Sequence, residues 1–210
     1  RSPKIAGCSR IQTVCRSRGR VRVLLTGFGP FGEVVSNPTE RLARRFGGLV
    51  LPTSFSRAPR MLWERLPGYD LVLMLGVAES AEEFRVETLG RNLDEARIAD
   101  VDGATPSGVI VEGAAETLPV TLDANAMCTA LTAAGIPAAL SPSAGAYVCN
   151  HVLYTTLHAL QGALQGALQG APPRAGFLHV PADRETHAVP RTERSFEVLV
   201  AAVEAALAVL

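Results

Sequence analysis

Cys149 is the residue of this sequence best placed to act as a nucleophile. It lies in the segment SAGAYVCNH (residues 143–151), where small and turn-forming residues give way to a helix-forming run. A cysteine in the first turn of a helix lies at the positive end of the helix dipole, which favours the thiolate over the thiol. The thiolate is the nucleophilic form, so the position suits covalent catalysis. The alternative is a small buried apolar residue, because free cysteine is among the most buried residue types.

Two further residues could form a catalytic group with Cys149. His179 ends a strand predicted over residues 175–180, and Glu87 lies in a short strand predicted over residues 84–89. A histidine near the sulfur could hold the thiolate and later protonate a leaving amine. A carboxylate on the other ring nitrogen would fix the tautomer of the imidazole. Taken singly, His179 could equally be a core histidine, and Glu87 a solvated strand residue.

The remaining histidines are weaker candidates for the base. His151 follows Cys149 by two helical positions, which is roughly 200° around the axis, so we expect it to point away from the sulfur. His158 and His187 have no feature nearby that would give them a better claim.

A glycine-rich loop, GFGPFG over residues 27–32, follows the first predicted strand. It matches neither G-x-G-x-x-G nor the P-loop with its lysine. The aromatic residues Phe28 and Phe31 suit a flat apolar ligand better than a phosphate. The alternative is a tight turn between strand and helix that places both rings in the core.

Strand and helix patterns alternate along the chain. Strands are expected over residues 21–28, 49–54, 70–77, 84–89, 136–140 and 175–180. Helices are expected over residues 38–46, 58–66, 123–134, 147–170 and 191–210. Asn37 is suited to cap the first helix, with Pro38 at its first position and Glu40 in a capping box. This alternation predicts a single-domain α/β fold, with a mostly parallel or mixed sheet covered by helices on both faces.

Two segments stand apart from this pattern. Residues 90–120 are rich in glycine, proline, asparagine and aspartate, which favour turns and loops. A loop of that length is usually functional or contains short strands. Residues 159–170 read ALQG three times, and each glycine costs a helix about 1 kcal/mol relative to alanine. We expect this tract to be a frayed or tolerated extension of its helix and not a site.

Composition and charge limit the class of protein. Residues 1–20 hold six basic residues, no acidic one, and no helical or strand period, which predicts a loosely ordered extension before a domain over residues 21–210. That domain has 14 basic against 20 acidic residues, a mildly acidic balance that argues against a nucleic-acid partner. No run of about 18 apolar residues occurs, so no membrane span is expected. The four cysteines, irregularly spaced, favour a reducing, cytoplasmic setting without a zinc site.

Four blocks of residues together resemble one family, pyroglutamyl peptidase I, which consists of cysteine peptidases. They are TGFGPFG with NPTE (26–32 and 37–40), VE with Asn92, Asp94 and Ala96-Arg97 (86–97), SAGAYVCN with Tyr154 and Leu157-His158 (143–158), and GFLHVP (176–181). The resemblance implies an open α/β sandwich and a triad of Cys149, His179 and Glu87. It also implies that N-terminal 5-oxoproline is removed from peptides through a thioester, without a metal or cofactor, by a cytoplasmic homotetramer.

The chemistry of that substrate agrees with the residues. A 5-oxoprolyl cap has no free amine, so the enzyme needs a flat apolar slot and no carboxylate to hold an ammonium. Phe28 and Phe31 could form the walls, and Asn37, placed like the family's loop asparagine, could bond the lactam. The resemblance also points to Arg97, Val77 and Val148 as neighbours of the ring. Amides at the helix start, including that of Cys149, could stabilise the oxyanion.

The sequence departs from the family pattern after the strand over residues 70–75. The family usually reads Gly-Gln-Ala-Gly-Gly-Arg, whereas residues 76–81 read GVAESA, and Thr88 replaces the usual arginine after the glutamate. These departures motivate a second hypothesis, a weakened or inactive binder of pyroglutamyl or lactam ligands. A third hypothesis is a nucleoside or phosphate enzyme on a similar sheet.

Overall fold

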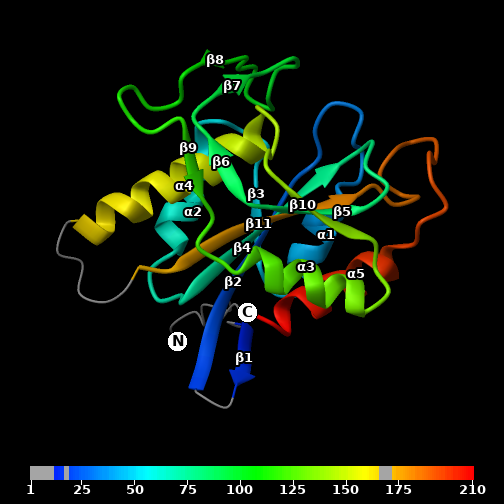
Figure 1. Cartoon of the computed structure of the whole chain (residues 1–210). Helices are drawn as coiled ribbons and strands as arrows, with labels where there is room; N and C mark the ends of the chain where they lie inside the picture. Colours follow the sequence, from blue (N-terminus) through cyan, green and yellow to red (C-terminus); the bar gives the residue numbers. More distant parts are fainter. Residues whose placement is uncertain (1–11, 17–18, 166–171) are drawn as a thin grey trace, which may run out of the picture.

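A mixed sheet with helices on both faces forms the body of the protein (Figure 1). The structure is a computed structural model that describes residues 12–16, 19–165 and 172–210. The main sheet has the order β1-β2-β4-β11-β5-β10, with β3 pairing with β2. Its strands are β1 (Gln12–Arg16), β2 (Gly19–Phe28), β3 (Leu49–Leu51), β4 (Leu71–Ala78), β5 (Phe84–Glu87), β10 (Ala138–Ser141) and β11 (Arg174–Pro181).

Strand direction reverses between β11 and β5, and again at the edge between β2 and β1. β3, β2, β4 and β11 run parallel to one another, β5 is antiparallel to β11, and β10 is parallel to β5. The carboxyl ends of β4 and β11 therefore lie beside the start of β5. The predicted single-domain α/β fold with a mostly parallel or mixed sheet is confirmed.

The helices divide between the two faces of the sheet. They are α1 (Pro38–Arg45), α2 (Arg57–Arg65), α3 (Ala124–Ala133), α4 (Val148–Gln165) and α5 (Phe196–Leu207). One hydrophobic cluster joins α1, α3 and α5 to the sheet through residues such as Leu42, Met127 and Val203. The other joins α2 and α4 through residues such as Leu62 and Tyr154. Figure 1 shows α2 and α4 together on one side and α3 and α5 on the other.

The segment over residues 90–120, predicted to be a loop that could contain short strands, forms two small antiparallel sheets. β6 (Leu89–Arg91) pairs with β9 (Thr117–Pro119), and β7 (Asp94–Glu95) pairs with β8 (Ser107–Gly108). The strand predicted over residues 84–89 divides at Thr88, whose backbone N–H donates to Ser141 while its carbonyl accepts from Val120. The chain leaves the main sheet at this point and forms a lobe above the start of α4 (Figure 1).

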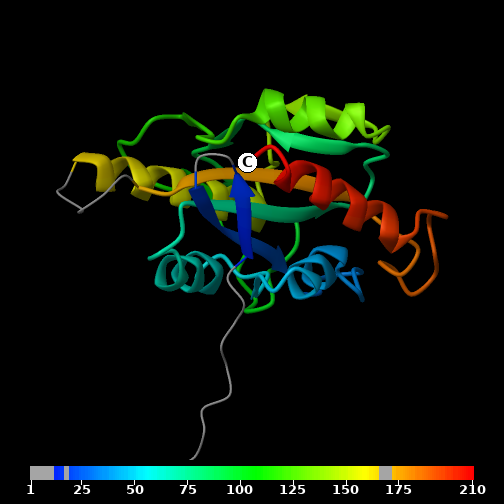
Figure 2. The same cartoon turned by 90° about the horizontal axis from the view of Figure 1, so that it is seen from below.

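Two predictions about the ends of the chain need correction. Residues 12–16 form β1, which pairs antiparallel with β2, although no strand period was expected in residues 1–20. The last helix begins at Phe196 and not at residue 191, because residues 182–195 form an extended loop held by Arg194, which donates to the carbonyls of Ala182 and Glu82. β1 lies beside the C-terminus of the chain in both views (Figures 1 and 2).

Some predictions concern residues outside the described part of the chain. These are the extension as far as residue 11, residues 17–18, and the end of the ALQG tract over residues 166–171. The start of that tract continues α4 as far as Gln165. No helix in the described ranges is both long enough and apolar enough to cross a membrane.

Candidate active site

The structure brings the three predicted catalytic residues together on the α4 face of the sheet. Cys149 lies in the first turn of α4, His179 lies near the end of β11, and Glu87 ends β5. The register of β11 and β5 places Glu87 opposite Phe177, so Glu87 is a diagonal neighbour of His179 on the same face. His179 Nδ1 lies 2.7 Å from Glu87 Oε1, and the His179 side chain also hydrogen-bonds with that of Cys149.

Burial and neighbouring charges together set the protonation state of His179. The side chain of Glu87 is fully buried and that of His179 is 9% exposed. Burial alone lowers the pKa of His179, but the hydrogen bonds and charges of Cys149 and Glu87 outweigh it and raise the pKa to about 9. The imidazole is therefore protonated near neutral pH, and Glu87 is the acceptor that fixes its orientation.

Gly76 makes room for the sulfur. It lies in β4 opposite His179 of β11, and a Cβ at this position would come within 2.8 Å of both Cys149 Sγ and the ring of Phe177. Any larger side chain would push the sulfur away from His179. No sequence motif predicted this role for Gly76, whose only local signal is that a glycine stands within the apolar run of a buried strand.

Asn37 and Thr39 fix the glycine-rich loop against α1. Asn37 is the N-cap: its Oδ1 accepts from the Thr39 backbone, as predicted, and its Nδ2 donates to the carbonyl of Gly29. Thr39 Oγ1 in turn accepts from the N–H of Phe28. A Cβ on Gly27 would lie 1.9 Å from the carbonyl oxygen of Thr39, so only glycine permits this approach. Asn37 thus shapes the loop through Oδ1 and one of its two Nδ2 hydrogens, and its predicted bond to the lactam stays a prediction.

An aromatic group lies between this loop and the start of α4. Phe31 contacts Tyr147 with ring centroids 5.9 Å apart, and Tyr147 packs edge-on against Phe55 at 5.3 Å. Ile98, 48% exposed, lies over the loop, since a Cβ on Gly32 would be 3.4 Å from its Cδ1.

Phe28, in contrast to Phe31, is only 2% exposed and belongs to the core beside α2 and α4. The accessible apolar walls are therefore Phe31, Tyr147 and Ile98. Of these, Tyr147 and Ile98 were not singled out from the sequence as wall residues. Tyr147 could have been found from its place two residues before Cys149.

The other predicted pocket residues differ in their exposure. Val77 and Val148 are both buried, with Val77 opposite Val180 in the sheet and Val148 opening α4. Arg97 is exposed and has no salt bridge within the described part of the chain. Val77 therefore lies within the sheet, Val148 lies next to Cys149 at the start of α4, and Arg97 lies at the surface, and their part in the pocket stays a prediction.

His151 is engaged elsewhere, as expected from its helical position. Its Nδ1 lies 2.7 Å from Asp94 Oδ2, and its ring packs edge-on against Phe55. His158 stacks on Tyr154, and His187 bonds Glu79. Among the described residues, no group of three or more His, Cys, Asp or Glu side chains is arranged to hold a metal ion.

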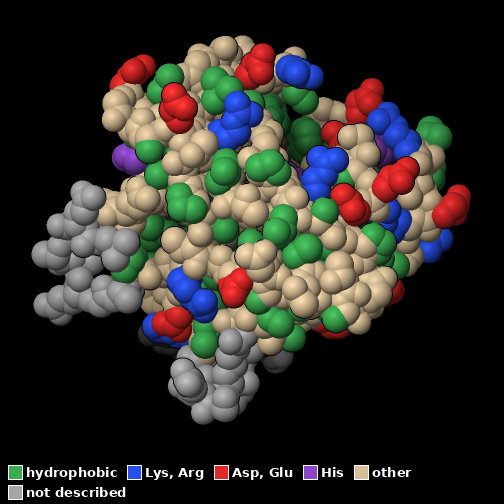
Figure 3. Space-filling view, viewed as in Figure 1, with side chains coloured by type: hydrophobic (Ala, Val, Ile, Leu, Met, Phe, Trp, Pro, Cys, Tyr) green, Lys and Arg blue, Asp and Glu red, His purple; other side chains and the backbone are tan. Residues whose placement is uncertain are grey.

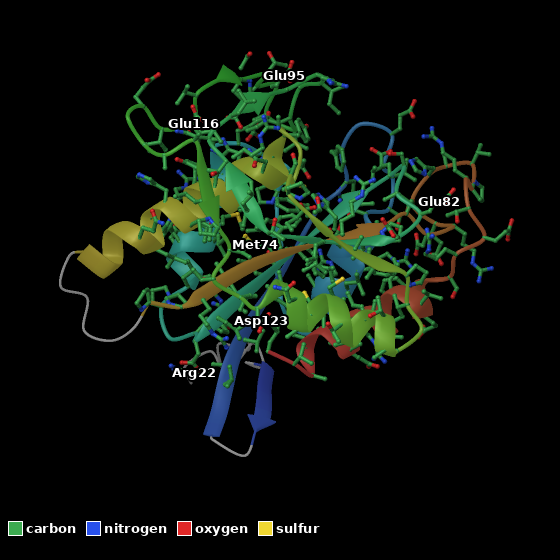
Figure 4. All side chains as sticks on the ribbon, viewed as in Figure 1. Arg22, Met74, Glu82, Glu95, Glu116 and Asp123 are labelled. Atoms are coloured by element: carbon green, nitrogen blue, oxygen red, sulfur yellow. The ribbon has the colours of Figure 1, made fainter. Side chains whose placement is uncertain are left out.

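The surface above these residues is hollowed. Figure 3 shows a recess between the lobe that carries β7 and β8 and the loops on the right of the molecule, with hydrophobic side chains in its depth. Figure 4 places Met74 of β4 near the middle of the sheet and Glu82 beyond the strand ends on the right.

A family model described as pyroglutamyl peptidase matches residues 21–210. The chain belongs to the pyroglutamyl peptidase family. Because this family consists of cysteine peptidases, the chain is a cysteine peptidase. The pyrrolidone-carboxylate peptidase of Thermococcus litoralis is 39% identical over 177 residues, which cover 76% of each chain. That of Gloeobacter violaceus is 40% identical over 174 residues, covering 77% of this chain and 82% of the relative.

Solved structures of the pyroglutamyl peptidase family have the same fold. The pyrrolidone carboxyl peptidase from Thermococcus litoralis superposes with a TM-score of 0.79 at 34% identity, covering 89% of this chain and 91% of the other. The enzyme from Fervidobacterium islandicum has a TM-score of 0.79 at 28% identity, with 89% and 96% covered. The α/β architecture that positions Cys149 is thus that of the pyroglutamyl peptidases.

Proposed function

We propose that this chain is a cysteine exopeptidase that cleaves the bond after an N-terminal 5-oxoprolyl residue. Cys149 is the nucleophile, His179 is the general acid and base, and Glu87 orients His179. The observation that carries this assignment is the position of His179, which bonds Cys149 on one side and the buried Glu87 on the other. This is the arrangement that a thiolate–imidazolium pair requires.

The reaction follows from these positions. The Cys149 thiolate attacks the carbonyl carbon of the 5-oxoprolyl residue, and the oxyanion receives hydrogen bonds from backbone N–H groups at the start of α4. His179 gives its proton to the leaving amine as the C–N bond breaks and the thioester remains. A water molecule then attacks the thioester and gives a proton to His179, and the departing thiolate is restored as free 5-oxoproline leaves.

The apolar walls support the choice of substrate. Flat or apolar surface lies beside the first turn of α4, which carries Cys149, and comes from Phe31, Tyr147 and Ile98. A lactam ring has two faces that such walls can cover, and it carries no charge that would need a partner. Asn37 contributes by holding the loop that bears Phe31. Val77, Val148 and Arg97 complete the proposed pocket, in which both valines are buried and Arg97 is exposed.

Hydrolysis of 5-oxoprolyl-aminomethylcoumarin tests the assignment. We expect Cys149→Ala to show no turnover above background, and Glu87→Gln to lose about 10²- to 10⁴-fold in kcat, since a misoriented histidine is a poor acid and base. His151→Gln is the matched control, because His151 bonds Asp94 and not the triad. Normal turnover by Cys149→Ala would contradict the mechanism.

The same assay separates the alternative of a non-catalytic lactam binder. Saturable binding of 5-oxoproline without hydrolysis, together with a Cys149 that iodoacetamide fails to alkylate near pH 7, would favour that alternative.

A reducing, cytoplasmic setting agrees with Cys128 and Cys149, which are both free thiols. Assembly into a homotetramer stays a prediction that sedimentation of the purified chain can check.

A further inference from the structure

A cavity of about 240 Å³ opens just beyond the strand ends that carry the site. It is lined by Glu79, Ser80, Ala81 and Glu82 on one side and by Ala182, Arg191, Thr192 and Arg194 on the other. A water molecule occupies about 30 Å³ in the liquid, so this volume has room for an amino-acid side chain. The cavity is a feature separate from the apolar walls around Phe31.

Its distance from the triad follows from the register of β4 and β11. Gly76 pairs with His179, and two residues later Ala78 pairs with Pro181. The cavity begins at the first residue after each strand, Glu79 after β4 and Ala182 after β11. At ~3.3 Å per residue, these positions lie roughly 10 Å beyond Gly76 and His179. A single side chain is shorter than this distance, so the backbone of the leaving peptide covers part of it and an extended side chain covers the rest.

The direction of the leaving peptide follows from the roles of the residues. The apolar walls lie on the loop side of Cys149, so the lactam occupies that side. His179 must reach the leaving amine to protonate it, so the first residue of the leaving peptide lies on the His179 side. Its side chain then faces the end of β11, where the cavity opens.

The guanidinium groups that line the cavity are already bonded. Arg194 donates to the carbonyls of Ala182 and Glu82, which ties the two walls together, and Arg191 bonds Glu33 at 2.6 Å. Glu79 uses Oε2 for His187, and its side chain remains 36% exposed. Arg194 keeps its positive charge, because it bonds carbonyls and not a carboxylate. Three carboxylates, of Glu33, Glu79 and Glu82, still outnumber the two guanidinium groups at the cavity. The acceptors left for a ligand are the second oxygen of Glu79 and the exposed carboxylate of Glu82.

We propose that this cavity is the subsite for the residue that follows 5-oxoproline, and that Glu79 and Glu82 make it prefer a lysine or arginine side chain there. The inference rests on the proposed function and adds to it the preferred class of peptide. A long cationic side chain fits because its apolar stem passes Ala81 and Ala182 while its head meets the two carboxylates.

The test compares three peptides, 5-oxoprolyl-Xaa-alanine amides with lysine, alanine or glutamate as Xaa. We expect kcat/KM to be highest for lysine and lowest for glutamate in the wild-type chain. In Glu82→Gln and Glu79→Gln the lysine-to-glutamate ratio should fall about twofold to fivefold each, as expected for partly exposed ion pairs. The wild-type ratio should also fall as salt is raised.

Glu83→Gln is the matched control, because Glu83 is an exposed neighbour that does not line the cavity. Its lysine-to-glutamate ratio should equal that of the wild type. Equal ratios in the wild type and in Glu82→Gln would overturn the subsite, whereas absence of hydrolysis for all three peptides would instead contradict the proposed function. Calorimetric binding of the same peptides to Cys149→Ala gives the order of preference without turnover, and an order that does not favour lysine would also overturn the subsite.

Discussion

His179 owes its charge to its two neighbours. A histidine this buried would ordinarily be neutral, because burial disfavours the charged form. Here Glu87 bonds Nδ1, and Cys149 and Glu87 together outweigh burial and raise the pKa of His179 to about 9. The residue is thus held in the state that can donate a proton to a leaving amine, and loss of either neighbour removes part of what holds it there.

The raised pKa of His179 predicts how pH affects both activity and stability. Its folded-state pKa of about 9 exceeds the ordinary 6.5, so the stabilisation is fully present below about pH 6.5 and is lost as pH rises through about 9. We expect kcat/KM to fall above about pH 9, and the free energy of unfolding to decline between about pH 6.5 and 9. A pH–rate profile and urea unfolding measure the two. A basic limb near pH 6.5 would show that the neighbours do not raise the pKa.

Residues that stand in a recognisable block of sequence were easier to interpret than those whose role comes only from contacts in the fold. The triad could be named because its three residues each stand in a recognisable block of sequence. Phe28 and Phe31 could not be told apart from the sequence, because both rings lie in the same loop and only the packing shows that Phe28 is the more deeply buried. Gly76 and Ile98 acquire their roles from contacts across the fold, with Cys149 and Gly32 respectively, and no local pattern encodes them.

Between elements, Gly76 sets how closely β4 approaches α4. A Cβ there would lie 2.8 Å from Cys149 Sγ and 2.8 Å from the Phe177 ring, closer than real Cβ contacts allow. We therefore expect Gly76→Ala to lower kcat at least tenfold while the chain still folds, because the sulfur moves out of line with His179. Gly162→Ala, which meets open space on α4, is the matched control and should keep full turnover. Unchanged kcat in Gly76→Ala would show that the sulfur tolerates the displacement.

Most elements of the sheet and its helices could be predicted because their patterns are local. The run DLVLMLGV reads as a buried strand, and Asn37-Pro38 opens a helix by its capping chemistry. β1 could not be predicted, because five residues gain strand structure only by pairing with β2. The short strands β7 and β8 are two residues each, too brief for any period to show in the sequence.

Across the whole molecule, one buried ion pair joins α1 to the loop that follows β11. Asp183 has no exposed side-chain surface, lies 2.7 Å from Arg41, and also accepts from Thr186. Because removing Arg41 leaves the fully buried charge of Asp183 uncompensated, Arg41→Ala should lower the free energy of unfolding by about 3–5 kcal/mol. Urea unfolding monitored by tryptophan fluorescence measures this. Glu33→Gln, which breaks the exposed pair with Arg191, should leave the midpoint essentially unchanged, and an equal effect of both variants would contradict the argument.

Catalysis depends on the register in which β5 pairs with the antiparallel β11. Side chains alternate between the faces of a strand, so a slip of one residue would carry Glu87 through the sheet to the side of α3 and α5. His179 would then face a valine or threonine in place of its acceptor, although nearly all backbone pairing would survive. Spectroscopic helix and strand content could not distinguish such a chain from the native one. Turnover per molecule can distinguish the two, and it therefore measures the fraction of a preparation in which β5 and β11 pair in the native register.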